Sequence, residues 1–400
     1  MMQNTTPAYA GGTPVRTEKI YYAHQMIDQA DIDAVAAVMR SDFLTAGPAI
    51  EETEKKLCEL TGAKYAVLCA NGTAALHIAC LAAGIKEGDE VITTPITFAA
   101  SANCALYCGA TPVFADIDPE TYQLDPVKVQ EKITEKTKAI IPVDFGGQAA
   151  DIDAFLKLAK EHGLLIIEDA SHSIGTKYHG RAVGSLSDMT VFSFHPVKTI
   201  CGGEGGAVLT DDEDLCKKLR LYRTHGITRD PAMMRHEPHG PWYYEQVALS
   251  TNYRITDMQA ALIGSQLNKL PAFAARRKEI CARYDEEFGK LPAFRVQKET
   301  EGSDTVRHLY ILRIDPEHFT LSRRELYDAL LAEGIVPNVH YLPVYRMPYY
   351  EDLGYKVGLC PEAERLYDEM LTLPLYAGMT DQDIEDVICA VTRIGEYYGR

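Results

Sequence analysis

Two residues whose side chains could take part in catalysis, Asp169 and Lys198, lie at or just after the end of segments that have the composition of buried strands. Asp169 ends the apolar run 164–169, and Lys198 follows the run 189–194 after a turn at Pro196. Ligands of open α/β sheets bind at the carboxyl ends of the strands, so we expect both side chains in one cleft. Burial there would lower the pKa of the lysine and favour the neutral amine that forms imines. Taken singly, Asp169 could instead cap the next segment, and Lys198 could lie on the solvated surface.

A possible phosphate site lies earlier in the chain. Gly72 and Thr73 follow a strand candidate over residues 65–69, at the point where a helix candidate over residues 73–83 begins. Gly72 permits close backbone approach, Thr73 offers a hydroxyl group, and the free N–H groups of a first helical turn attract an anion. An ordinary strand-to-helix turn is the alternative. The glycine-rich residues 202–206 lead into a strand, so we interpret them as a constrained turn near the lysine.

These features together suit pyridoxal 5′-phosphate (PLP). A lysine can hold this cofactor as a Schiff base, and a carboxylate against the pyridine nitrogen keeps that nitrogen protonated, so that the ring accepts electrons from a substrate carbanion. A helix N-terminus can bind the phosphate group. The sequence contains neither GxGxxG nor a P-loop motif, which disfavours dinucleotide and nucleoside triphosphate enzymes.

The first part of the chain is predicted to form an α/β domain. Short apolar runs alternate with amphipathic segments such as residues 152–162. Most of these runs are continuous rather than alternating in polarity, as strands covered by helices on both faces require. The strand candidates are residues 65–69, 90–93, 111–116, 139–144, 164–169, 189–194 and 206–210.

The character of the chain changes after Asn252, where a smaller α+β domain is predicted. We expect an N-terminal arm over residues 1–28, a large domain over residues 29–265 and a small domain over residues 266–400. Asp28 is the expected N-cap of a helix that runs to Met39 and packs back on the small domain. The predicted later elements are helices over residues 256–270, 275–291, 322–333 and 381–398 and a strand over residues 308–314.

Composition excludes several classes of function. The 400 residues carry a net charge of −17 and no basic run, so nucleic acid is not an expected partner. No stretch approaches the length of a membrane span and residues 1–16 lack an apolar signal core, which predicts a protein of the cytoplasm without a membrane partner. The ten cysteines include no CxxC pair and no cysteine–histidine cluster, so we expect reduced thiols and no metal site.

A series of collinear motifs covers nearly the whole chain, from about Tyr21 to Arg393. They are SDFLTAGP (41–48), NGTAAL (71–76), TPITFAAS (94–101), EDASHSIG (168–175), FSFHPVK (192–198), GGEGG (202–206), HGITR (225–229), NYRITDMQAAL (252–262) and VHYLPVY (339–345). These motifs resemble the DegT/DnrJ/EryC1/StrS family of sugar aminotransferases. The resemblance implies fold type I of the PLP-dependent transferases, with a large α/β/α domain around a mostly parallel sheet of seven strands and a smaller C-terminal α+β domain.

Three segments most resemble the branch of this family that serves pseudaminic acid biosynthesis. They are WYYEQ (242–246), FHPVKTI (194–200) and VHYLPVYRMPYY (339–350). The resemblance implies that L-glutamate gives its amino group, by way of pyridoxamine phosphate, to C4 of a UDP-linked 4-keto-6-deoxy-N-acetylhexosamine. The products would be 2-oxoglutarate and UDP-4-amino-4,6-dideoxy-N-acetyl-β-L-altrosamine.

Other activities within the family are alternatives. The substrate could be a dTDP-linked keto-hexose or the bacillosamine precursor. A PLP-binding regulatory protein without turnover is a further alternative. Lys198 argues against a sugar dehydratase, because those relatives carry histidine at this position.

The resemblance assigns roles to residues around the cofactor ring. Lys198 is the Schiff-base lysine, and Asp169 is the partner of the pyridinium nitrogen. Phe98 stacks on the pyridine face, and His172 hydrogen-bonds near the phenolic oxygen. Residues expected to handle the substrate are Arg254, His340 and Tyr341.

Phosphate ligands are implied in the same way. They are Gly72, Thr73 and Ser193, together with Asn252 of the neighbouring subunit, so the resemblance implies a homodimer with shared active sites. The chain departs from the family at residues 70–71, where relatives often carry two serines, and this leaves the geometry of the phosphate site open. It also departs at residues 201–203, where relatives carry bulkier or hydroxylated residues.

Overall fold

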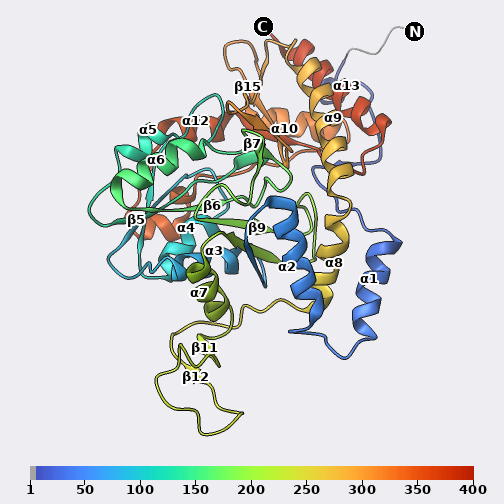
Figure 1. The fold of residues 1–400 in the computed structure, drawn as a ribbon. Coiled ribbons are helices and arrows are strands. Elements are labelled where there is room, and N and C mark those ends of the chain that lie inside the picture. Colours follow the sequence, from blue (N-terminus) through green and yellow to red (C-terminus); the bar gives the residue numbers. More distant parts are fainter. Residues whose placement is uncertain (1–5) are drawn as a thin grey trace.

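A mostly parallel sheet of seven strands forms the centre of the protein (Figure 1). The computed structural model describes residues 6–400. The strand order is β2-β10-β9-β6-β5-β3-β4, and within this sheet β10 alone runs antiparallel to its neighbours. All seven strand candidates predicted between residues 65 and 210 are found in this sheet. The strands are β2 (Tyr65–Cys69), β3 (Glu90–Thr93), β4 (Thr111–Phe114), β5 (Thr137–Ile141), β6 (Leu165–Asp169), β9 (Met189–Ser193) and β10 (Gly206–Thr210).

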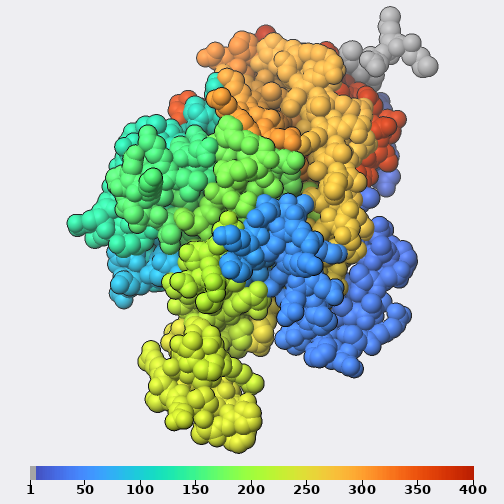
Figure 2. All heavy atoms as spheres, viewed as in Figure 1, coloured from blue at the N-terminus to red at the C-terminus, as the bar shows by residue number. Residues whose placement is uncertain are grey.

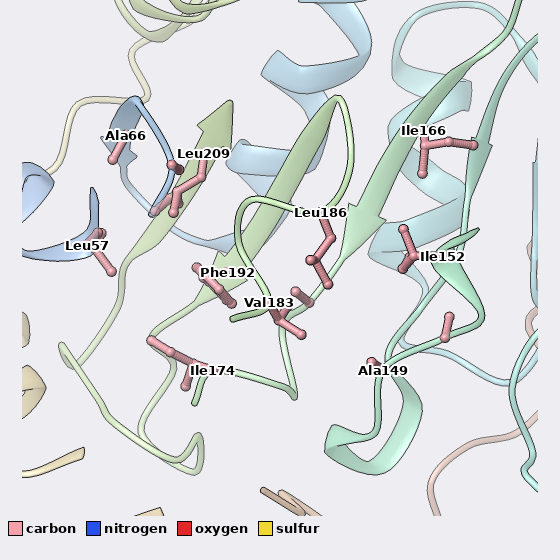
Figure 3. Packing of buried hydrophobic residues seen from close by; sticks show 14 of the residues in the cluster. Leu57, Ala66, Ala149, Ile152, Ile166, Ile174, Val183, Leu186, Phe192 and Leu209 are labelled. Atoms are coloured by element: carbon pink, nitrogen blue, oxygen red, sulfur yellow. The ribbon is translucent and has the colours of Figure 1, made fainter. Parts of the chain in front are cut away.

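Helices cover both faces of this sheet, which explains the continuous apolar runs of its strands. Successive side chains of a strand point to opposite faces. On β9, for example, Val191 belongs to a hydrophobic cluster with α3 (Gly72–Ala82), α4 (Ala100–Tyr107) and α7 (Glu213–Arg223). Its neighbour Phe192 belongs to the opposite cluster, part of which is drawn in Figure 3. The helices of that second cluster are α2 (Pro48–Thr61), α6 (Ile152–His162) and α8 (Asp257–Leu267).

The later part of the chain forms a three-stranded sheet that packs with helices. The sheet has the order β13-β15-β17, and α9 (Leu270–Phe288) and α13 (Asp381–Tyr398) share its hydrophobic cluster. Helix α9 begins five residues before the predicted residue 275, because Pro271 lies in its first turn, where a missing N–H costs nothing. The other elements of this part are β13 (Phe294–Val296), β15 (Tyr310–Ile314), β17 (Met370–Leu373), α10 (Arg323–Ala332), α11 (Pro348–Asp352) and α12 (Pro361–Glu369).

The N-terminal segment joins different parts of the fold. Asp28 is the N-cap of α1 (Gln29–Met39), as predicted, and the structure adds a capping box with Asp31. Helix α1 packs against α8, and Asp31 accepts hydrogen bonds from Ser265 and Gln266. Strand β1 (Ile20–Tyr21) pairs with β16 (Ile335–Val336). Residues 1–5 of the expected arm lie outside the described residues, and the division into an arm and two domains stays a prediction.

Small elements complete the chain. Figure 2 shows that the segment around β11 (Ile227–Thr228) and β12 (Glu245–Gln246) extends away from the body of the protein. None of the helices within residues 6–400 is long and apolar enough to cross a membrane. The remaining elements are α5 (Pro126–Gln130), β7 (Lys177–Tyr178), β8 (Arg181–Ala182), β14 (Ser303–Asp304) and three 3-10 helices, Ala8–Ala10, Phe145–Gly147 and Val344–Arg346.

Candidate active site

A cavity of about 470 Å³ lies where β6 and β9 end and α3 begins. This is the carboxyl edge of the parallel strands, where an α/β sheet presents its ligand site. Nine of the residues predicted for the site line this cavity: Gly72, Thr73, Phe98, Asp169, His172, Ser193, Lys198, His340 and Tyr341. They come from both the sheet and the later part of the chain, so folding brings them together from distant segments.

Asp169 is a buried carboxylate that two neighbours hold in place. Its Oδ2 atom accepts a hydrogen bond of 2.7 Å from Ser101 Oγ, and its Oδ1 atom accepts one of 3.2 Å from the backbone N–H of Ser171. The hydroxyl groups of Thr97 and Ser101 lie 2.7 Å apart. A buried carboxylate needs such donors to offset its loss of hydration. Asp169 therefore has a fixed orientation at the edge of the cavity.

Lys198 lies in a short turn after β9, with its backbone N–H bonded to His195 O. Burial lowers the pKa of its ammonium group to about 8, and the negative charge of Asp169 partly opposes this shift. About a tenth of the Lys198 side chains are therefore neutral amines at pH 7, which is far more than for an exposed lysine, and the neutral amine is the form that attacks a carbonyl. Glu204, from the glycine-rich turn that precedes β10, lines the same cavity.

The beginning of α3 forms an anion cup. Asn71 caps the helix, and its side chain accepts a hydrogen bond from the N–H group of Ala74. The N–H groups of Gly72 and Thr73, at the first two positions, find no carbonyl inside the helix. A Cβ atom on Gly72 would lie 2.9 Å from Ser193 Cβ, so only glycine leaves room beside this serine. Asn71 is therefore the N-cap of the helix whose first N–H groups form this cup.

Three imidazoles lie around the far side of the cavity. His172 Nε2 lies 3.3 Å from the hydroxyl oxygen of Tyr341, and the ring of His308 contacts that of His172 in a tilted arrangement with ring centroids 4.7 Å apart. His340 is joined through Nδ1 to Thr372 at 2.8 Å. Burial lowers the pKa of all three rings, that of His340 to about 4, and the charge of Lys198 acts in the same direction. All three imidazoles are therefore neutral at physiological pH.

Two aromatic rings stand at the entrance of the cavity. Phe98 is 62% exposed, and its ring centroid lies 6.3 Å from that of Tyr341. Tyr22, from the N-terminal segment, lies against His340 with ring centroids 5.2 Å apart. An exposed aromatic face beside a cavity is suited to stacking on a planar ligand.

Asn252 and Arg254 are not among the residues that line this cavity. Asn252 is exposed and forms an isolated bridge with Thr224, and its side chain accepts a weak hydrogen bond from the backbone of Arg254. This position agrees with the expectation that Asn252 acts from a neighbouring subunit, which stays a prediction. The substrate role of Arg254 also stays a prediction.

The residues present fit PLP as a bound group. The cup at Gly72 offers N–H donors to a phosphate, Lys198 offers an amine, and Asp169 offers a carboxylate. His172 lines the same cavity beside Tyr341, with its Nε2 atom 3.3 Å from the hydroxyl oxygen of the tyrosine. Each chemical part of the cofactor thus meets a complementary group.

Comparison with known proteins identifies the family. Residues 25–392 match the model of the DegT/DnrJ/EryC1/StrS aminotransferase family. The chain belongs to this family. It is 41% identical over 381 residues to the spore coat polysaccharide biosynthesis protein SpsC of Bacillus subtilis, covering 95% of this chain and 98% of that protein. It is 39% identical over 371 residues to the UDP-4-amino-4,6-dideoxy-N-acetyl-beta-L-altrosamine transaminase of Campylobacter jejuni, covering 92% and 95%.

Solved structures of the family share the fold over almost their whole length. PseC of Helicobacter pylori, an aminotransferase of pseudaminic acid biosynthesis, has a TM-score of 0.88 at 32% identity and covers 96% of this chain and 100% of its own. Spr1654 of Streptococcus pneumoniae in its PMP form has a TM-score of 0.88 at 31% identity and covers 95% and 100%. The same protein has also been solved in a PLP form. The fold type expected from the sequence motifs is confirmed.

Several residues of the cavity were not anticipated from the sequence. Ser101 and Tyr22 reach it from segments far from Asp169, and His308 enters just before β15. Ser101 ends the motif over residues 94–101, which was a usable signal. His308 carried no such signal, because the sequence placed it as the first residue of an apolar strand over residues 308–314 in the predicted small domain.

Proposed function

We propose that this protein is a PLP-dependent aminotransferase that transfers the amino group of L-glutamate to C4 of a UDP-linked 4-keto-6-deoxy-N-acetylhexosamine. The product is UDP-4-amino-4,6-dideoxy-N-acetyl-β-L-altrosamine. The observation that carries the reaction type is the presence of Lys198, Asp169 and the α3 cup in one cavity. The choice of sugar is supported by the likeness to the Campylobacter jejuni transaminase.

The residues of the chain divide the chemistry among them. PLP supplies an electron sink for a carbanion that forms at the carbon bearing the nitrogen. Lys198 Nζ, as a neutral amine, removes the proton from Cα of glutamate and acts in the reverse sense on the sugar. Asp169 holds a negative charge against the ring nitrogen, and the N–H groups at Gly72 and Thr73 bind the phosphate. His172 donates toward the phenolic oxygen.

The reaction type is tested by absorbance. The purified protein should bind PLP with a visible band that bleaches on addition of glutamate, with release of 2-oxoglutarate. Lys198→Arg is the matched control, because arginine keeps a cation but cannot form an imine. Steady turnover of glutamate and keto-sugar by Lys198→Ala would exclude the proposed role of the lysine. A wild-type band that is unchanged by glutamate would indicate a PLP-binding protein without turnover.

The sugar is tested with a panel of substrates. The panel contains the UDP-linked 4-keto sugar, the bacillosamine precursor and dTDP-linked 3- and 4-keto-hexoses, and products are identified by NMR. The likeness to SpsC supports another polysaccharide precursor as the second candidate. Comparable kcat/KM values for the UDP and dTDP sugars would contradict the proposed specificity.

We further propose a homodimer in which Asn252 completes the phosphate site of the partner. The exposed position of Asn252, away from the cavity lining of its own chain, supports this. Asn252→Ala and Lys198→Ala chains should each be inactive alone. Because a mixed dimer assembles one intact site from the two chains, random mixing should restore about a quarter of wild-type activity. Mixtures that stay inactive, although mass measurements show exchanged subunits, would contradict shared sites.

A further inference from the structure

Three cysteines and a histidine meet where α3 packs against α4, and none of them lines the cavity of the candidate active site. His77 and Cys80 lie three residues apart on α3, and Cys104 and Cys108 lie four residues apart at the end of α4. Side chains at these spacings share one face of a helix. Tyr107 of α4 also contacts His77, with ring centroids 5.3 Å apart. The two helices therefore present these faces to each other.

The three thiols contact one another in a row that ends at the histidine. Cys80 forms hydrogen bonds with the thiols of Cys104 and Cys108, and Cys108 forms one with His77. The ring of the histidine is held from its other side, because its Nδ1 atom lies 2.9 Å from the hydroxyl oxygen of Tyr253. All three cysteines are free thiols. Within residues 6–400, the ligand atoms of this row do not converge on one point as a metal site requires.

The surroundings of two of these thiols give them different reactivities. Cys108 is half-buried, whereas Cys80 is fully buried within the hydrophobic cluster of α3. The hydrogen bond with Cys80, with a contribution from His77, lowers the pKa of Cys108, although burial opposes this shift. Hydrogen bonds with the other two thiols, together with burial, raise the pKa of Cys80. Cys108 is therefore the thiol that ionises first and that solvent reaches, and the thiolate is the nucleophilic form.

We propose that Cys108 and Cys80 form a peroxide-reactive dithiol, in which Cys108 is oxidised first and Cys80 converts the product into a disulfide. This inference does not depend on the proposed function. It assigns a reversible modification site to the contact between α3 and α4, with hydrogen peroxide as the oxidant.

The chemistry takes two steps. The sulfur of Cys108 attacks hydrogen peroxide, an S–O bond forms, the O–O bond breaks and hydroxide leaves, so the sulfur is oxidised to a sulfenic acid while peroxide is reduced. The sulfur of Cys80 then attacks that of Cys108. An S–S bond forms, the S–O bond breaks, and the hydroxyl group leaves as water with the thiol proton of Cys80.

The disulfide would join two helices that both contribute to the candidate active site. Gly72 of the anion cup begins α3, and Ser101, which donates to Asp169, lies in the first turn of α4. The cross-link lies at the opposite ends of these helices, where Cys108 is the C-cap of α4. Oxidation would therefore restrict the movement of the cup relative to the donor of Asp169 without placing a group in the cavity.

The test exposes the purified, reduced protein with its cofactor to hydrogen peroxide and maps the modified cysteines by peptide mass spectrometry. Wild type should lose two hydrogen atoms, form a Cys80–Cys108 disulfide, and regain its original mass with dithiothreitol. In Cys80→Ala the sulfenic acid has no resolving thiol, so dimedone should label Cys108. Cys389→Ala removes an exposed thiol on α13 and is the matched control, which should form the disulfide at the wild-type rate.

The comparison of Cys108 with Cys389 decides whether the thiol is activated. At pH 7 Cys108 should be oxidised several-fold faster than Cys389, because a larger fraction of it is thiolate. A disulfide between Cys108 and Cys104, or no disulfide at peroxide concentrations that oxidise Cys389, would overturn the proposal. If Cys80→Ala does not fold, the peptide map of the wild type still decides. The oxidation involves neither glutamate nor a keto-sugar, so a failure of the proposed function would leave this result unchanged.

Discussion

Ser101 Oγ donates a hydrogen bond of 2.7 Å to Asp169 Oδ2, although 68 residues separate the two in the chain. Because Ser101 donates to the carboxylate, the hydroxyl group of Thr97, 2.7 Å away, supplies the proton in the bond to Ser101 Oγ. Both residues belong to the segment between β3 and the first turn of α4. The cavity therefore depends on contacts between neighbouring crossovers of the sheet.

Replacing Ser101 with alanine should weaken catalysis without removing the cofactor. The carboxylate of Asp169 loses one of its donors, so its orientation against the pyridine nitrogen is less fixed. Hydrogen bonds to charged groups contribute about 1.5 kcal/mol or more, which corresponds to a roughly tenfold loss of kcat. Ser171→Ala is the control, because Ser171 contacts Asp169 through its backbone. Steady-state kinetics and cofactor absorbance check this, and equal kcat values in the two variants would contradict it.

Uptake of PLP by the cofactor-free protein should depend on the protonation of Lys198. Burial lowers the pKa of this amine to about 8, so about a tenth of it is neutral at pH 7 and most is neutral at pH 9. The rate of imine formation should therefore rise by roughly tenfold over this range and level off above it. Stopped-flow absorbance measures the rate. A profile that keeps rising toward pH 10.5 would indicate an unshifted lysine.

The lowered pKa of Lys198 should also make the stability of the cofactor-free protein depend on pH. The folded pKa lies below the ordinary value of 10.5, so the unfolded chain binds more protons between these values. The contribution of Lys198 to the free energy of unfolding should therefore rise with pH from about 8 to about 10.5. Lys198→Met removes the titrating group, so the stability of the wild type relative to this variant should rise with pH in denaturant titrations. A difference that falls with pH would contradict the assignment.

Gly72→Ala should lower both stability and cofactor affinity. The new methyl group would lie 2.9 Å from Ser193 Cβ and 3.1 Å from its Oγ, and overpacking of this kind costs about 1–3 kcal/mol. Adding Ser193→Gly removes both clashing atoms, so the double variant should recover much of the stability lost. It should not recover the affinity for PLP, because Ser193 is a proposed phosphate ligand. Purely additive losses in denaturant titrations would contradict the steric explanation.

Local patterns in the sequence were sufficient for the sheet. The boundaries of the strands β2, β3 and β10 and of the helices α6 and α13 agree with the predicted ranges, because continuous apolar runs and caps are local signals. The start of α9 was predicted five residues too late, at residue 275, although Pro271 in the first turn is itself a local signal for a helix start. The start of α1 was predicted correctly from one residue, because Asp28 is a typical N-cap.

Local patterns do not predict which residues from distant parts of the chain come together in the cavity. Asp169 and Lys198 were anticipated in one cleft because both follow strands of a parallel sheet. His308 and Tyr22 reach the same cavity from segments whose own sequences are ordinary, and their positions follow from how the later part packs on the sheet. The partner of a buried polar group is set by tertiary packing, which no periodicity in the chain encodes.

The contact of α1 with α8 should depend on one buried carboxylate. Asp31 is 1% exposed and accepts hydrogen bonds from Ser265 and Gln266, and Lys269 Nζ lies 2.6 Å from its Oδ2 atom. Asp31→Asn weakens a charged hydrogen bond to Lys269, which is partly exposed and keeps Asp28 as a partner, so the expected loss is about 1.5 kcal/mol. Hydrogen exchange in α1 should then become much faster, whereas Asp33→Asn, on the exposed face of the same helix, should leave it unchanged.

The stabilising effect of Asp31 should also depend on pH in a defined direction. Although burial opposes it, the hydrogen bonds from Lys269, Ser265 and Gln266 hold the pKa of Asp31 below its ordinary value of 3.8. The stabilising contribution is therefore complete above that value and is lost as pH falls through the lower folded pKa. Wild type and Asp31→Asn should thus differ most near neutral pH and converge in acid. A difference in the free energy of unfolding that grows on acidification would show that the carboxylate is protonated in the folded protein.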